Sequence, residues 1–282
     1  MKKISQSQIK LLAIFCMALA PFISIAGGGW TKQKGKAYYK VSHWWIDAAK
    51  QFTFDGSSVA SVEEGIFNTS IFAEYGFTDR FTGIVNLPYS KSANDTESIS
   101  GIGDTDVAFK YRITKSNSKF VLAGTLQLGL PFGEDAGGSD GSLQTGDGEF
   151  NQIYRLDLSK SFQISSINAY ANVYSAFNNR TQNFSDEMRV GAEVGAGFLN
   201  NKIWAIVRLD VVESFQNGAE STAASDGATI FANNTEYMAY SYEIAGYITE
   251  KIGISASTAS VFSASNIFAA PAYSVGVFLD LK

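Results

Sequence analysis

The chain has 282 residues, a formal net charge of −5, one cysteine and one histidine. Its acidic balance argues against nucleic acid as a partner, because neutralising phosphates requires stripes of lysine and arginine. With 17% charged residues, four prolines and 26 glycines, the composition favours a β-rich chain, and no capped helical pattern stands out.

The first 26 residues have the pattern of a secretory signal peptide. Lysines near the start precede the apolar run LLAIFCMALAPFISIA, and the small residues at its end predict cleavage after Ala26. A transmembrane anchor is the rival interpretation, but the run is barely long enough and Pro21 interrupts it. Cleavage would remove Cys16, the only thiol, and with it any disulfide or cysteine-based metal chemistry. We therefore expect an exported domain over residues 27–282.

Beyond this segment, twelve stretches alternate apolar and polar residues between turn residues, which is typical of β-strands. Most are longer than the ~5–6 residues of a strand in a globular sheet. They match the ~9–11 residues with which a tilted strand crosses a bilayer. The predicted strands are 34–47, 62–76, 80–90, 102–113, 119–132, 148–160, 165–179, 188–198, 203–215, 233–247, 251–263 and 270–282.

The connections between these strands alternate in length along the whole chain. Tight turns follow the even strands, whereas longer loops follow the odd ones, at 48–61, 91–101, 133–147, 180–187, 216–232 and 264–269. Short turns at one rim and long loops at the other are expected of an outer-membrane barrel. The fold class predicted is all-β: a transmembrane antiparallel up-and-down β-barrel of twelve strands, with short periplasmic turns, longer extracellular loops and both termini in the periplasm.

The segment GIGDTDVAFKYRI, residues 101–113, shows which face of such a strand is inside. Its charged residues alternate with apolar and aromatic ones. A cationic side chain on the lipid face costs ~2–4 kcal/mol near the midplane, so we expect the charges to face the lumen. The candidate lumen-lining residues are Glu74, Asp104, Asp106, Lys110, Arg112, Arg155, Asp157, Arg189, Glu193, Arg208, Asp210 and Glu243.

Several short motifs carry a resemblance to a known family. They are AEYGFTDR at 73–80, VNLPY at 85–89, GIGD at 101–104 leading into FKYR, LGLPFG at 128–133, and LQTGD at 143–147. In this order and spacing the chain resembles the meta-pathway phenol-degradation family of outer-membrane proteins of Gram-negative bacteria, best over residues 60–160. The resemblance implies a twelve-stranded barrel that passes small, often aromatic or apolar, molecules. The chain departs from the usual aromatic end of outer-membrane strands, since it finishes Asp280-Leu281-Lys282.

Two functions follow from these observations. The first is an outer-membrane channel for passive passage of small solutes, hydrophobic or aromatic ones among them, through a charge-lined lumen that selects by charge and size. The second is a structural or adhesive surface barrel, in which the same charges pair and plug the lumen while the loops bind partners. The expected partners are outer-membrane lipid, a small-molecule solute and the barrel-insertion machinery, and the oligomeric state is left open.

Catalysis and metal binding have little support in the sequence. The only histidine, His43, falls on the predicted lipid face, and no second histidine completes a triad or a metal site. The loop at 133–149 carries Asp135, Asp140 and Asp147, but their spacing does not reproduce an EF-hand. We expect no enzyme, no cofactor and no metal.

Overall fold

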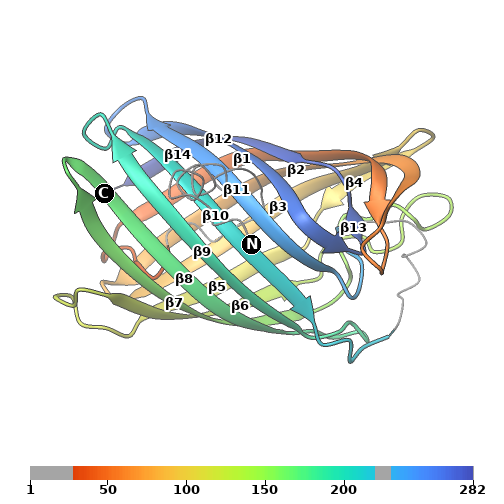
Figure 1. Ribbon diagram of the computed structural model, residues 1–282, viewed down its shortest axis with the longest axis horizontal. Helices are drawn as coiled ribbons and strands as arrows, with labels where there is room; N and C mark the ends of the chain where they lie inside the picture. Colours follow the sequence, from red (N-terminus) through yellow and green to blue (C-terminus); the bar gives the residue numbers. More distant parts are fainter. Residues whose placement is uncertain (1–27, 220–229, 282) are drawn as a thin grey trace, which may run out of the picture.

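The computed structural model describes residues 28–219 and 230–281, and all regular structure within them is β-strand (Figure 1). None of these residues forms a helix that is long and apolar enough to cross a membrane. The strands are β1 (Ala37–Phe52), β2 (Ser58–Thr78), β3 (Phe81–Asn94), β4 (Ser98–Ile102), β5 (Thr105–Arg112), β6 (Val121–Leu130), β7 (Asn151–Ile164), β8 (Ile167–Asn179), β9 (Glu187–Phe198), β10 (Ile203–Ser214), β11 (Glu236–Tyr247), β12 (Ile252–Ser265), β13 (Ile267–Phe268) and β14 (Ala272–Leu281).

These strands close into one antiparallel barrel. With the exception of the short strands β4 and β13, successive strands of the chain pair with one another, and β1 pairs with both β2 and β14, which joins the two ends of the sheet. β4 and β5 pair with successive parts of β3, and β13 and β14 pair with successive parts of β1. Each of these two couples therefore occupies the position of a single strand in the barrel wall. The predicted twelve-stranded antiparallel barrel is thus confirmed.

The two ends of the barrel differ. At the end we call the turn end, β1 begins, β14 finishes, and short connections join the strands at 79–80, 165–166, 199–202 and 248–251. The opposite end, the loop end, carries the connections 131–150, 180–186 and 215–235. Figure 1 shows the strands running strongly tilted between these two ends.

Two predicted loops are largely wrong. Most of 48–61 and 91–101 is strand, because β1 and β2 remain paired as far as Phe52 and Ser58, and β3 turns directly into β4. The predicted strand 102–113 is interrupted at 103–104. Gly103 keeps the ladder by donating its N–H to the Pro88 oxygen at 2.9 Å, while the Asp104 carboxylate turns away to the loop at 131–150.

Side chains alternate between the two faces of the wall. On β5, Phe109 and Tyr111 are exposed on the outside, whereas Lys110 between them is 1% exposed. The same alternation places Leu156 outside and Asp157 inside on β7. Since the outer surface is apolar while the buried side chains include many charged groups, the barrel is inverted relative to a water-soluble sheet.

Residues 28–36 enter the barrel at its turn end, where 33–35 are exposed at the rim and Gly28 and Gly29 are buried in the lumen, and we call them the inner segment. Next to β1, the Gly35 N–H donates to the Gly76 oxygen at 2.8 Å. Farther back in the chain, the Gly29 N–H donates to Ser159 Oγ on β7 at 2.7 Å. Because β7 lies across the barrel from β1, the inner segment crosses the lumen.

A second obstruction lies toward the loop end. Buried apolar residues of β1, β2, β11, β12, β13 and β14 pack together there, and Ile230 and Phe231 from the adjoining loop pack against them. The buried members are Ile46, Ala48, Ile66, Ala239, Ala259, Phe268 and Ala272. The interior is therefore narrowed at two levels.

The predicted signal peptide, residues 1–26, lies outside the described residues and stays a prediction.

Candidate solute site in the barrel lumen

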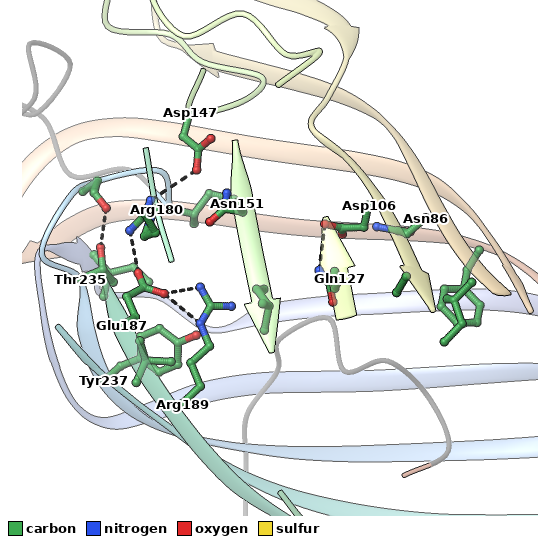
Figure 2. A pocket seen from close by; sticks show the side chains of 18 residues that line it. Asn86, Asp106, Gln127, Asp147, Asn151, Arg180, Glu187, Arg189, Thr235 and Tyr237 are labelled. Atoms are coloured by element: carbon green, nitrogen blue, oxygen red, sulfur yellow. Dashed lines mark hydrogen bonds and ion pairs between the residues drawn. The ribbon is translucent and has the colours of Figure 1, made fainter. Parts of the chain in front are cut away.

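A cavity of about 280 Å³ lies in the lumen on the loop side of the barrel (Figure 2). The strands β2, β3, β5, β6, β7, β9, β10, β11 and β13 contribute to its wall, and the loop residues Asp147, Arg180, Ile230, Ala232 and Thr235 complete the lining. Its lining is Phe72, Ile84, Asn86, Asp106, Ala108, Gln127, Asp147, Asn151, Ile153, Arg180, Glu187, Arg189, Val212, Ile230, Ala232, Thr235, Tyr237 and Ile267. The wall thus combines apolar and ionic surface.

One part of this wall is apolar. Phe72, Ile84 and Ala108 occupy inward positions on three adjacent strands and pack against one another as a buried cluster. Ile153 on β7 and Val212 on β10 extend the apolar lining across the cavity. This surface can hold a hydrocarbon or aromatic group away from water.

Asp106 supplies one ionic group to the cavity. Its carboxylate accepts a hydrogen bond from Gln127 Nε2 at 2.9 Å, and Figure 2 shows Asn86 beside it. No cation among residues 28–219 and 230–281 lies within ion-pair distance of Asp106. The carboxylate therefore relies on neutral donors.

The second ionic group is built around Glu187. Arg189 Nε donates to its Oε2 atom at 2.9 Å, with a further contact from the same guanidinium, and Arg180 NH1 donates to Oε1 at 2.6 Å. The side chains of Arg180 and Glu187 are 6% and 4% exposed, whereas that of Arg189 is 32% exposed. Arg189 is thus the member of this cluster that is open to the cavity.

Arg180 also ties two loops together. It forms ion pairs with Glu149, and with Asp147 at 3.5 Å, both in the loop at 131–150. Burial raises the pKa of Asp147 well above its ordinary value, and the charges of Glu149 and Asp104 raise it further. Burial likewise raises the pKa of Glu149, against the opposing effect of Arg180. These contacts hold the loops over the cavity.

A charged belt crosses the lumen between the cavity and the turn end. On one side Arg208 bridges Glu193, at 2.5 Å, and Glu243, at 2.9 Å, and Lys40 pairs with Glu243 at 2.9 Å. On the other side Arg155 pairs with Asp157 at 2.8 Å. Paired charges remain ionised inside a narrow barrel at a lower cost than isolated ones.

The structure groups most of the residues predicted from the sequence. Glu193, Arg208, Glu243, Arg155 and Asp157 form the belt, and Asp106 and Arg189 line the cavity. The remaining inward residues are Asp210, which accepts a hydrogen bond from Tyr174 at 2.5 Å, and the buried Glu74 and Lys110.

Two predicted residues lie apart from the others. The Asp104 carboxylate accepts the Gly133 and Asp147 N–H groups at 2.9 and 2.7 Å and so anchors a loop. Arg112 donates to the main-chain oxygens of Lys115 and Ser116 in a connection at the turn end. Neither contacts the charged belt.

Several charged residues of the site are not among those predicted from the sequence: Lys40, Asp147, Glu149, Arg180 and Glu187. Glu187 begins β9 one residue before the predicted strand, and Arg180 lies wholly in a loop. Lys40 was in a predicted strand, on the face opposite the exposed residues Tyr39 and Val41, so its alternation would have identified it. No alternation exists in a loop, so nothing in the sequence marks Arg180.

The remaining candidates for chemistry are peripheral. His43 is exposed on the outer face, where Nδ1 hydrogen-bonds Thr69 Oγ1 at 3.0 Å and the ring stacks on Trp45. Within the described ranges, no group of three histidine, cysteine, aspartate or glutamate side chains is placed to hold a metal ion.

No protein-family model matches the sequence, and no curated protein matches it. Among solved structures, the COG4313 outer membrane channel from Pseudomonas putida F1 is 13% identical with a TM-score of 0.64, covering 91% of this chain and 99% of that chain. The β domain of the Bordetella autotransporter BrkA is 11% identical with a TM-score of 0.50, covering 88% and 100%. The KdgM porin bound to disordered oligogalacturonate is 10% identical with a TM-score of 0.48, covering 86% and 98%. At these identities, the likeness to the first two shows a shared fold, that of an outer-membrane β-barrel.

Proposed function

We propose that this protein is an outer-membrane channel through which small solutes, hydrophobic or aromatic ones among them, pass without an energy source. The observation that carries the proposal is the amphipathic cavity inside a closed barrel, above a belt of charged side chains. The apolar outer face supports insertion into a membrane, and the contrast in loop length supports an orientation with the turn end in the periplasm and the loop end outside.

The charge-lined interior supports selection by size and charge. At twelve strands, a barrel lies between the filled eight-stranded and the open sixteen-stranded forms. The inner segment and the charged belt narrow it further. We therefore expect a small conductance and passage of small molecules only.

The second candidate is a structural or adhesive barrel with a closed lumen. It is favoured by the amount of the interior that is filled, since the inner segment and the apolar cluster obstruct two levels. In that case the loops at the loop end would carry the function by binding partners outside the cell.

Single-channel recording in planar bilayers separates the two candidates. A channel gives discrete conductance steps, and vesicles containing it swell in small phenols faster than in larger sugars. Ala108→Phe, which places a ring in the cavity, should lower the conductance, whereas Ala73→Phe on the other face of the wall should not. A folded wild-type protein that never conducts and never accelerates solute uptake would favour the closed barrel.

A further inference from the structure

We propose that the cavity binds molecules with a carboxylate at one end, a hydroxyl or ammonium donor at the other, and an apolar body between. This inference rests on the proposed function, because it names the substrate class of the same site. It follows from two opposite charges, Arg189 on β9 and Asp106 on β5, which line one cavity without pairing with each other (Figure 2).

Arg189 has donors to spare for a carboxylate. A guanidinium has five N–H groups, and Arg189 uses its Nε and NH2 atoms on a single oxygen of Glu187. Glu187 is also shared with Arg180 and Asn178. Planar N–H pairs suit carboxylates geometrically, so the exposed face of Arg189 is the anion-binding end of the cavity.

Asp106 has acceptors to spare for a donor. An ionised carboxylate offers about four acceptor positions. Gln127 Nε2 occupies one of them and the Asn86 amide a second, which leaves about two for a solute. Because the carboxylate has no cation partner among the described residues, an ammonium or hydroxyl from a solute would satisfy it. Asp106 is therefore the donor-binding end.

The apolar wall and the volume define the body between these ends. Phe72, Ile84 and Ala108 form continuous apolar surface next to Asp106. The cavity has a volume of about 280 Å³, slightly below the range of ~300–1,000 Å³ that is typical of pockets for drug-sized ligands. It has room for a single ring or a short chain and not for an oligomer.

The test is equilibrium binding to the full chain in detergent, with 4-hydroxybenzoate, benzoate and phenol as probes in isothermal titration calorimetry. 4-Hydroxybenzoate satisfies both ends and should bind about tenfold or more tightly than either single-ended probe. Tenfold corresponds to ~1.4 kcal/mol, which one additional hydrogen bond to a charged group can supply. Equal binding of the three probes, or no binding of any, overturns the inference without the need for a variant.

Variants assign the two ends. Arg189→Gln should remove the advantage of 4-hydroxybenzoate over phenol, and Asp106→Asn should reduce its advantage over benzoate. Arg189→Lys keeps the charge that pairs with Glu187 but loses the planar N–H pair. It should therefore reduce the advantage over phenol without removing it, and it serves as the test if the glutamine variant does not fold. The controls are Arg112→Gln and Asp210→Asn, whose side chains are outside the cavity lining, and they should bind like the wild type.

The binding proposal and the channel proposal can be disproved independently of each other. A protein that conducts in bilayers but does not distinguish the three probes disproves the substrate class and leaves the channel intact. A protein that prefers 4-hydroxybenzoate but never conducts keeps the site and disproves passage through the barrel.

Discussion

The ammonium group of Lys110 donates a 2.8 Å hydrogen bond to the main-chain oxygen of Gly28. Lys110 lies on β5, and Gly28 is the first described residue of the inner segment. The contact fixes the inner segment across the lumen at a distance from β1, where the segment joins the wall. The side chain of Lys110 is buried, so this carbonyl replaces water as its hydrogen-bond acceptor.

Lys110→Met should release the inner segment, because it keeps the length of the side chain and removes the donor. We expect a larger single-channel conductance and easier proteolysis of the amino-terminal residues. Lys160→Met is the matched control, since Lys160 lies on the exposed side of β7, over the Phe120 ring. An unchanged conductance for both variants would show that the contact does not limit passage.

Gly76→Ala should displace the inner segment by steric clash. A Cβ atom at Gly76 would lie 2.1 Å from the Gln33 oxygen and 2.6 Å from the Lys32 oxygen. Overpacking of this kind costs ~1–3 kcal/mol, so the thermal unfolding temperature in detergent should fall. Gly101→Ala, where a Cβ meets nothing within 4 Å, should leave it unchanged. Equal effects at both positions would contradict the clash.

Arg208→Gln should destabilise the barrel and change its ion selectivity. Glu193 and Glu243 would lose the cation between them, and removing one partner of a buried pair costs ~3–5 kcal/mol. Reversal potentials in a salt gradient should shift toward cations, because two carboxylates remain. The triple variant, in which both glutamates are also changed to glutamine, should recover much of the stability. If the reversal potential shifts in neither variant, the charged belt is not part of the ion path.

Asp147→Asn should alter how stability depends on pH. The pKa of Asp147 is raised above its usual 3.8 by burial and neighbouring carboxylates, so the folded protein holds this proton more tightly than the unfolded chain does. The protonated Asp147 therefore contributes to the free energy of unfolding. This contribution is complete below the pKa of the group in the unfolded chain, and it is lost as the pH rises through its pKa in the folded protein. At pH 7 the variant should therefore unfold at a higher temperature than the wild type, and near pH 4 the two should converge. Asp95→Asn, at an exposed turn, should follow the wild type throughout.

Phe109→Arg tests which face meets lipid. Phe109 is 40% exposed on the outside of β5, where an arginine facing hydrocarbon costs ~2–4 kcal/mol. We expect poor insertion into vesicles and a lower unfolding temperature. Phe54→Arg, at the exposed connection between β1 and β2, should insert normally. If both variants insert equally well, the outer face of β5 is not in contact with acyl chains.

The fold could be predicted from the sequence because it depends on a local pattern. Lys110 alternates with Phe109 and Tyr111, so the two kinds of side chain take opposite faces of the strand. The hydrocarbon core of a bilayer offers no hydrogen-bonding partners to the main chain, and strands with this pattern must therefore close into a barrel. The same reasoning placed His43 on the outer face and most of the charges on the inner one. It failed for the lengths of β1 to β4, since strands can continue as paired hairpins beyond the membrane.

The site depended on tertiary structure. Arg189 and Asp106 are far apart in the sequence, and the order of strands around the barrel determines that both line one cavity. The role of Arg180 depends on where its loop folds, and the path of the inner segment depends on Ser159 and Lys110 on distant strands. A period of two residues specifies which face a side chain takes. Which side chains meet across the lumen is decided by the register and closure of the whole sheet.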